Sequence, residues 1–482
     1  MSGPNPAAAQ HALPVDSSFA PWRREAWATL KLAWPLALTQ LAQIAMTTTD
    51  IVLLGWLSPQ ALAAGALGFA VFIVFQLFTL GVVVGAIPSM AQARGRGRDV
   101  VRETRRSVRM GFWAAFIVGF PSVAAMWIIG PLLKTTGQDV VVAELASDYI
   151  QTLSLCMVPF LCFIVLRAFV ATFDRPRSAV IVTMIGMVAN GVFNYALIFG
   201  EWGMPPLGVI GAGLGTTAAD LLMLAIMLVF LRIDRRFSRF ALLGGFWRPD
   251  WPRLREILRV GLPIGVSLLF EVALFASGTF MMGLIAPDQL AAHQIALQIA
   301  SVTFMVPLGI GQAVTIRVGI AAGAGNREGI RFAGWVALAL GVGFMLLSAL
   351  IITVLPRPLA GLFLGGAVGA EREAVLHYAV LFLGFAAVFQ IFDAIQVIGL
   401  SILRGLKDTR VPMILTAFSY WGVGFSLSAG LAFGLGWGGP GIWAGYVGSL
   451  VVASILIVAR FYWRERFKGL RATIDRATRA ST

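Results

Sequence analysis

The sequence predicts an all-α membrane protein in which twelve transmembrane helices form two six-helix lobes. Three observations lead to this fold class. The chain of 482 residues is 58% hydrophobic and only 12% charged, whereas a soluble protein would be about one quarter charged. Long uncharged segments recur, and each could cross about 30 Å of hydrocarbon as a helix. Finally, the second half of the sequence repeats the first.

The uncharged segments define twelve expected spans. We place them at residues 28–55, 61–88, 108–132, 145–172, 178–200, 207–231, 256–286, 290–322, 332–355, 374–403, 411–435 and 440–462. We expect the first six in a lobe of residues 21–240 and the last six in a lobe of residues 241–465. A long linker, residues 232–255, joins the two lobes.

The two ends of the chain differ from the spans in composition. Residues 1–20 are small and polar, without the apolar core of a cleavable signal, and we expect a disordered N-terminal tail. Residues 466–482 are rich in arginine and are expected to form a basic cytoplasmic tail. Cys156 and Cys162 both fall in the fourth span, so neither suggests a disulfide framework.

The net charge of +14 comes from short connectors between spans. Connectors after even-numbered spans are rich in arginine, whereas most after odd-numbered spans carry almost no positive charge. The positive-inside rule then places both termini in the cytoplasm, which agrees with an even number of spans. This distribution excludes a nucleic-acid binder and predicts a multi-pass protein of the inner (plasma) membrane.

The two halves of the sequence align with each other over long stretches without a gap. An offset of 228 residues pairs Pro35 with Pro263, Gly55 with Gly283, Gly81 with Gly309 and Gly95 with Gly323, and an offset of 233 pairs Thr183 with Thr416. Six spans are an even number, so both halves cross the membrane in the same sense. The lobes should therefore be related by a pseudo-two-fold axis along the membrane normal, as in several transporter families.

Two acidic residues lie deep in the second half, Glu271 in the seventh span and Asp393 in the tenth. A carboxylate at the bilayer centre costs about 2.5–3.5 kcal/mol on insertion scales, so function is the default hypothesis. The pair could hold Na⁺ through oxygen ligands or could hold a proton, and either ion could compete with a cationic substrate. A carboxyl that merely bonds a neighbouring helix is the alternative. Gln43, the counterpart of Glu271 in the first half, is a further candidate for ion or substrate binding.

The first half carries its acid at another position, Asp50 in the first span. Asn190 and Asn194 lie four residues apart on one face of the fifth span and could offer neutral oxygens to a cation beside Asp50. Inter-helix hydrogen bonding is the alternative for both. Thr216 and Asp220 in the sixth span are weaker candidates. Asp50 could instead be a carboxyl with water access near the outer edge.

Aromatic residues flank the acids of the second half at helical spacing, namely Phe270, Phe275, Phe389 and Phe392. Packing is the default role of each. Phe389 precedes Asp393 by one turn and could face the cleft, where an aromatic face beside a carboxylate suits a lipophilic cation. For His293, a structural contact between helices is favoured over a proton relay.

The sequence lacks the motifs of the common enzyme classes. It has no H-E-x-x-H, no G-x-S-x-G and no glycine-rich phosphate loop with its lysine. We therefore expect neither catalysis nor a cofactor, and transport must use an ion gradient or be passive.

Several stretches carry a resemblance to a known family. They are "GLPIGVSLLFEVALF" and "QVIGLSILRGLKDTR" in the second half, and "TDIVLLGWLSPQALAA" and "NGVFNYALIFGEWGMPPLGVIGAGLGT" in the first. On these residues the chain resembles the multidrug and toxic compound extrusion (MATE) family, in particular its NorM-like branch, from about residue 28 to residue 462.

The resemblance implies two lobes forming a V and export of organic cations and lipophilic drugs coupled to Na⁺ or H⁺. It matches Glu271 and Asp393 to the second-lobe cation-site carboxylates, and Asp50 to the first-lobe aspartate. Asn190 and Asn194 match positions that help to build the first-lobe pocket. The chain departs from the pattern at Phe389, where relatives commonly have tyrosine.

We expect small cationic or lipophilic substrates, a surrounding lipid bilayer, no nucleic acid and no obligate protein partner, hence a monomer. The runner-up is a lipid-linked precursor flippase or polysaccharide exporter of the same wider superfamily. That function would require a cleft with basic residues at mid-membrane depth that bind phosphates. Arg167 and Arg317 are instead expected toward the cytoplasmic ends of their spans. A passive channel is a third alternative.

Overall fold

The computed structural model describes residues 20–135, 139–242, 244–364 and 369–466. Within these residues, twelve helices are long and apolar enough to cross a membrane, which confirms the predicted number. The predicted tails, residues 1–20 and 466–482, lie outside the described part of the chain except for one residue each.

The first six spans are built from eight helices. They are α2 (Ala20–Leu57), α3 (Pro59–Val84) with α4 (Ile87–Arg96), α5 (Val100–Leu132), α6 (Val140–Ser154) with α7 (Met157–Thr172), α8 (Pro176–Phe199) and α9 (Val209–Ile233). Two spans are thus interrupted, one before Ile87 and the other at residues 155–156. The short helix α10 (Arg235–Ser238) follows in the linker.

The last six spans begin after the linker. They are α11 (Trp251–Gly283), α12 (Pro287–Gly323), α13 (Arg327–Val354), α15 (Gly369–Gly405), α16 (Arg410–Ala417) with α17 (Ser426–Ala429), and α18 (Gly439–Arg466), and the short α14 (Pro356–Gly361) lies between α13 and α15. The eleventh span includes π-helical turns at Phe418–Phe425 and Gly430–Gly434, a feature that often accompanies functional sites.

Most helices extend beyond the spans expected from hydropathy. The second span was expected to end at residue 88, yet the helix α4 continues to Arg96. The tenth was expected at 374–403, whereas α15 covers Gly369–Gly405. The added turns contain polar and basic residues, which a helix can carry past the hydrocarbon core because its own backbone hydrogen bonds are satisfied.

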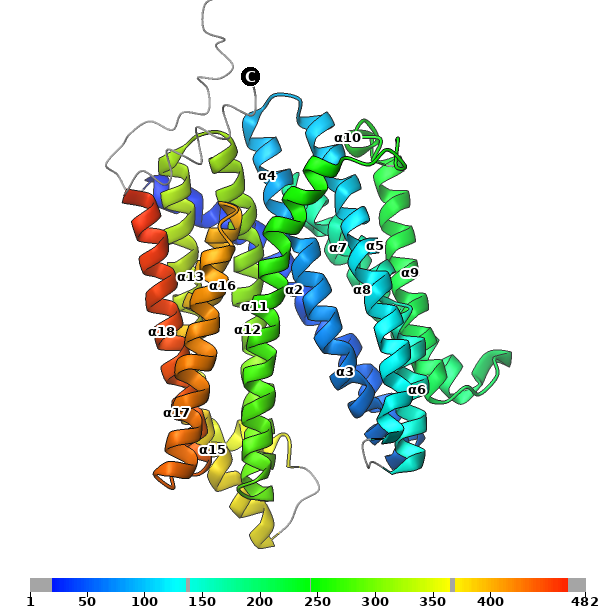
Figure 1. Ribbon diagram of the computed structural model, residues 1–482, viewed down its shortest axis with the longest axis vertical. Coiled ribbons are helices and arrows are strands. Elements are labelled where there is room, and N and C mark those ends of the chain that lie inside the picture. Colours follow the sequence, from blue (N-terminus) through cyan, green and yellow to red (C-terminus); the bar gives the residue numbers. More distant parts are fainter. Residues whose placement is uncertain (1–19, 136–138, 243, 365–368, 467–482) are drawn as a thin grey trace, which may run out of the picture.

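The helices form two bundles that make a V (Figure 1). The bundle containing α3 to α9 and the bundle containing α11 to α18 approach each other at the end that carries α10 and diverge toward the opposite end. By the arginine distribution, the closed end is the predicted cytoplasmic end. The residue boundaries of the two lobes stay a prediction.

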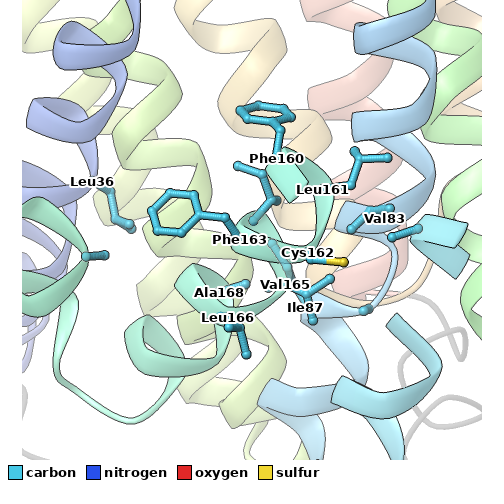
Figure 2. Close-up of a cluster of buried hydrophobic side chains, with 14 of the residues drawn as sticks. Leu36, Val83, Ile87, Phe160, Leu161, Cys162, Phe163, Val165, Leu166 and Ala168 are labelled. Carbon is cyan, nitrogen blue, oxygen red and sulfur yellow. The ribbon is translucent and has the colours of Figure 1, made fainter. Parts of the chain in front are cut away.

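The fourth span is the central helix of the first lobe. In its most apolar window 83% of the residues are buried, against 28–50% in the other spans. Side chains of α7 such as Leu161, Phe163 and Leu166 pack against Leu36 of α2 and Val83 of α3 (Figure 2). This packing fixes the rotation of α7 within the first lobe, because an interior helix must fit neighbours on every side.

Glycines permit the lobes to touch at the closed end. A Cβ added to Gly81 of α3 would lie 2.5 Å from the Cα of Gly265 of α11, and one added to Gly309 of α12 would lie 2.6 Å from the backbone nitrogen of Ala37 of α2. The offset of 228 residues takes Gly81 to Gly309 and Ala37 to Gly265. These two crossings are therefore equivalent, as the pseudo-two-fold relation predicts, and small residues let the backbones approach this closely.

Candidate functional site

A buried polar cluster joins three helices of the first lobe. Asp50 of α2 is 7% exposed, and Asn190 and Asn194 of α8 are fully buried. Asn194 Nδ2 donates to Asp50 Oδ1 at 2.5 Å, and Thr216 Oγ1 of α9 donates to Asp50 Oδ2 at 3.1 Å. Asn190 Nδ2 donates in turn to Thr216 Oγ1 at 3.1 Å. The structure thus brings together four of the predicted residues, which we name the first-lobe cluster, and it places Asp50 away from the water-accessible edge.

The first-lobe cluster retains acceptor oxygens without hydrogen-bond donors. The Oδ1 atoms of Asn190 and Asn194 are buried and have no partner. A Cβ at Gly215 would lie 2.0 Å from Asn194 Oδ1, so glycine at this position makes room for the amide. Leaving a buried acceptor unsatisfied costs about 1–3 kcal/mol. Carboxylate, amide and hydroxyl oxygens are the ligands that hard cations prefer, so the donor set fits a cation.

Asp220 extends this polar region along α9. It lies one turn after Thr216 and is 4% exposed. Its carboxyl hydrogen-bonds the Cys156 thiol and interacts electrostatically with Asp50. Cys156 occupies the break between α6 and α7, so the interruption of the fourth span occurs beside two buried acids. Irregular backbone at membrane depth is tolerated where it is surrounded by protein in this way.

Gln43 is separated from the first-lobe cluster by two turns of α2. Its Oε1 accepts a hydrogen bond of 3.3 Å from Arg167 Nη1, which also lies 3.5 Å from Thr39 Oγ1. Arg167 is 5% exposed, on α7. Sequence analysis placed this arginine toward the cytoplasmic end of its span, but its side chain is enclosed by first-lobe helices because α7 is central.

The second lobe holds its two acids on different helices. Glu271 of α11 and Asp393 of α15 interact electrostatically, and Asp393 is 7% exposed while Glu271 is partly exposed. Tyr420, in the π-helical part of the eleventh span, interacts with both acids. Gln396 Nε2 donates to the Tyr420 hydroxyl at 2.8 Å. These residues form what we call the second-lobe group.

Arg404 also belongs to the second-lobe group, since it interacts electrostatically with Glu271. Sequence reasoning missed Arg404, Gln396 and Tyr420, and it counted Arg404 only as a charge of the cytoplasmic connector. A signal was present, because residues three and eleven positions after Asp393 return to the same face of a helix. An arginine beside the carboxylates gives this group a cationic side chain that the first-lobe cluster lacks.

Phe389 lies inside the second lobe and does not face an open cleft. It is 3% exposed and contacts the rings of Phe275, Trp443 and Tyr446 at centroid distances of 5.9, 5.9 and 6.4 Å. His293 is fully buried beside the same aromatic rings, with Nε2 3.2 Å from Thr279 Oγ1. The contacts of His293 fit the structural role expected for it.

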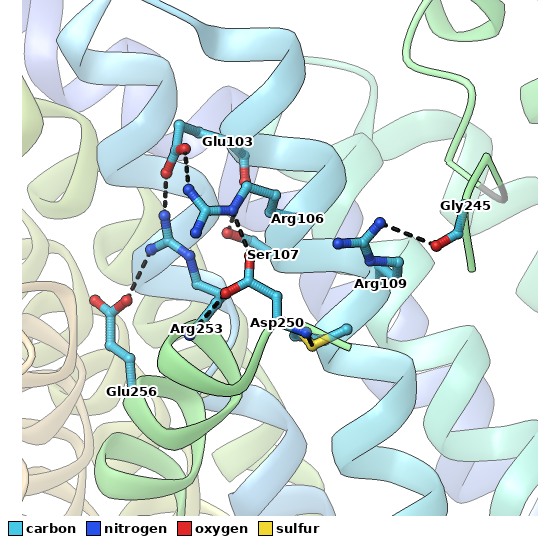
Figure 3. A network of polar contacts seen from close by, with 9 residues as sticks. Glu103, Arg106, Ser107, Arg109, Gly245, Asp250, Arg253 and Glu256 are labelled. Atoms are coloured by element: carbon cyan, nitrogen blue, oxygen red, sulfur yellow. Dashed lines mark hydrogen bonds and ion pairs between the residues drawn. The ribbon is translucent and has the colours of Figure 1, made fainter. Parts of the chain in front are cut away.

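An ion network joins the lobes at the closed end (Figure 3). It connects Glu103 and Arg106 of α5 with Asp250, Arg253 and Glu256 at the start of α11, and with Lys407 before α16. Arg253 binds Glu103 across the two lobes and binds Glu256 at 2.8 Å. The Arg106 guanidinium, 2.5 Å from Asp250, holds the pKa of that carboxyl below its ordinary value. Arg317 pairs with Glu25 in a second bridge, between α12 and α2.

The chain is similar to known proteins both in sequence and in structure. The sequence pattern of the MatE family matches residues 35–196 and 263–429, in one half of the chain and then the other. The chain belongs to the MatE family. It is therefore a transporter and not an enzyme.

Individual MATE relatives cover nearly the whole chain. A "Probable multidrug resistance protein NorM" of Mesorhizobium japonicum is 44% identical over 92% of this chain and 95% of the relative. The "Multidrug resistance protein NorM" of Burkholderia vietnamiensis is 38% identical over 91% of this chain and 94% of its own length.

Solved structures of MATE transporters have the same fold. A eukaryotic MATE transporter, AtDTX14, superposes with a TM-score of 0.82 at 19% identity, over 95% of this chain and 99% of that chain. An outward-facing multidrug resistance MATE family transporter gives 0.81 at 21% identity, over 94% and 96%. The twelve-helix V is thus the fold of the family, and this chain is a multi-pass membrane protein.

Proposed function

We propose that this chain, a multidrug-efflux transporter of the MATE family, exports organic cations and other lipophilic compounds in exchange for Na⁺ or H⁺. The observation that best supports ion exchange is the first-lobe cluster. There, the buried Asp50 carboxylate is held by Asn194 and Thr216, beside two amide oxygens without donors. Such a cluster suits a monovalent cation or a proton, and no cofactor is needed.

The two lobes, residues 21–240 and 241–465, would rock about the glycine contacts of the closed end. A coupling ion bound at the first-lobe cluster from the outside neutralises Asp50, and the second-lobe group of Glu271 and Asp393 provides a second station. If ion and drug favour different states of the two lobes, each lowers the affinity for the other, because coupling between sites is reciprocal. Phe389 would then act on the substrate only through the packing of the second lobe.

The transporter would work as a monomer with both termini in the cytoplasm. The ion network at the closed end supports this orientation, because it lies among the arginine-rich connectors that the positive-inside rule assigns to the cytoplasm. Gln43 would contribute by holding Arg167 within the first lobe.

Export of a cationic dye into inverted membrane vesicles tests this function. A Na⁺ gradient and a pH gradient are imposed separately, and dye accumulation is followed by fluorescence. Drive by Na⁺ alone would favour an oxygen-ligated ion at the first-lobe cluster, and drive by protons alone would favour protonation of the buried carboxyls. Export that responds to neither gradient would contradict the antiport mechanism.

A further inference from the structure

Two neighbouring cavities at the closed end are rich in arginine, which supplies three of the seven residues lining the first and four of the seven lining the second. The first, of about 410 Å³, is lined by Arg102 and Arg105 of α5 and by Arg239. The second, of about 460 Å³, is lined by Arg175, Arg235, Arg236 and again Arg239. Both volumes fall within the range of small-molecule sites, about 300–1,000 Å³. Among the described residues lining them, only Asp99 is acidic.

The arginines of these cavities differ from the other arginines of the closed end in having few acidic partners. Arg94, Arg253 and Arg317 each bind a carboxylate directly. Within the described part of the chain, no ion pair involves Arg102, Arg235, Arg236 or Arg239, and Arg175 is 4.0 Å from Asp234. The two cavities therefore concentrate positive charge that the protein compensates only in part, through Asp99 and Asp234.

Two of these arginine side chains, Arg105 and Arg239, make local contacts that do not cancel their charge. Arg105 Nε donates to the carbonyl oxygen of Phe240 at 2.5 Å, and the Arg239 guanidinium lies 5.4 Å from the centre of the Phe240 ring. Arginine presents five N–H donors in a planar fork, which suits bidentate binding of phosphate. Because Arg239 lines both cavities, two phosphate groups could bind on either side of one guanidinium.

The position of the cavities favours a lipid over a soluble anion. Their arginines come from α10 and the residue after it, from the start of α5 and from the residue before α8. Helix α10 lies at the end of the first-lobe bundle near α9 (Figure 1), where spans leave the hydrocarbon on the predicted cytoplasmic side. The half-buried Phe173 lines the second cavity beside its arginines, whereas Phe237 and Phe240 are buried beneath them. A ligand with both anionic groups and apolar chains can contact the arginines and the phenylalanine. Basic pockets at the cytoplasmic ends of transmembrane helices are typical sites for anionic headgroups.

We propose that the Arg239 cavities bind one phospholipid headgroup with two phosphates, of the diphosphatidylglycerol type, from the cytoplasmic leaflet. Each phosphate occupies one cavity and shares the Arg239 guanidinium. The site is separate from the first-lobe cluster and from the second-lobe group.

Native mass spectrometry of the purified full-length protein tests this proposal by titration with tetraoleoyl diphosphatidylglycerol. Phosphatidylglycerol, with one phosphate, and zwitterionic phosphatidylcholine serve as comparison lipids. One arginine near a charged membrane surface contributes about fivefold in affinity. We expect Arg239→Gln to weaken binding by about fivefold, and the combined change of Arg235, Arg236 and Arg239 to glutamine to weaken it about a hundredfold.

Arg327→Gln is the matched control, since Arg327 is an exposed arginine at the closed end of the second lobe and lines neither cavity. Its affinity should stay within about twofold of the wild type. If the triple variant does not hold its fold, as judged by thermal unfolding in detergent, Arg102→Gln replaces it, with an expected loss of about fivefold.

Three results would overturn the proposal. They are equal affinity of Arg239→Gln and the wild type, equal losses in Arg239→Gln and Arg327→Gln, and displacement of the lipid by inorganic pyrophosphate at the lipid's own concentration. The last result would make a free anion the ligand.

Discussion

The two lobes have the same fold but present their buried charges differently. In the first lobe, Asp50 accepts hydrogen bonds directly from Asn194 and Thr216, and no arginine takes part in that cluster. In the second lobe, Glu271 and Asp393 interact electrostatically across two helices, with Arg404 close to Glu271. A duplicated sequence has thus produced two unlike sites.

The difference indicates different tasks for the lobes. The first-lobe cluster combines a carboxylate with unsatisfied neutral oxygens, an arrangement that can bind a cation without displacing a protein cation. The second-lobe group already contains a guanidinium, which can compensate one of its two carboxylates. We infer that, in the proposed exchange, the first lobe binds the coupling ion more directly than the second.

The largest effect is expected at Asp50. Asp50→Asn should lower ion-driven dye export by at least about a hundredfold, because removing one charge of a buried ion–carboxylate pair costs about 3–5 kcal/mol. Inverted vesicles with an imposed gradient measure the rate. Asp148→Asn, at an exposed acid of the same lobe, should leave it unchanged, and wild-type export by Asp50→Asn would remove the first lobe from the mechanism.

A smaller effect is expected in the second lobe. Glu271→Gln and Asp393→Asn should each lower export about tenfold, and the double variant should lose little more, because interacting groups give coupling energies of about 0.5–3 kcal/mol. The same vesicle assay completes this double-mutant cycle. Glu373→Gln, at an exposed acid of the lobe, is the control. Multiplicative losses would mean that the two acids act independently.

The close glycine contact between the two lobes should be destabilised by a larger side chain. A Cβ at Gly261 would lie 2.1 Å from the Val82 carbonyl oxygen, whereas Gly384 has no atom within 4 Å of its added Cβ. Gly261→Ala should therefore destabilise the closed end by about 1–3 kcal/mol, and Gly384→Ala should not. Spin-label distances across the closed end measure the effect, and equal distances in the two variants would contradict the packing argument.

The smallest effect is expected in the ion network. Arg106 lowers the pKa of Asp250, so the ionised carboxyl stabilises the folded protein. That stabilisation is complete above the ordinary aspartate pKa of about 3.9 and is lost as pH falls through the lowered value. Asp250→Asn should cost up to about 1 kcal/mol at pH 7, and thermal midpoints of variant and wild type should converge on acidification. A difference between the two thermal midpoints that grows as the pH falls would contradict this prediction.

Much of the fold follows from local sequence. Each span must satisfy its own backbone hydrogen bonds in lipid, so an uncharged run of sufficient length predicts a helix without knowledge of its neighbours. The spacing of Asn190 and Asn194 on one helical face is likewise a local property. Hydropathy did not predict the interruption beside Cys156 or the π-helical turns around Tyr420, because both spans are apolar throughout.

The sequence by itself determined the twelve helices, the duplication and the short set of acids whose cost in a membrane makes them candidate site residues. Only the tertiary structure decided which residues meet. Asp50 finds Asn194 and Thr216 at separations of 144 and 166 residues. Arg404 interacts electrostatically with Glu271 of another helix, and Phe389 packs into the second lobe. The rotation and tilt of a spanning helix depend on its packing against other helices and not on its own hydrophobicity.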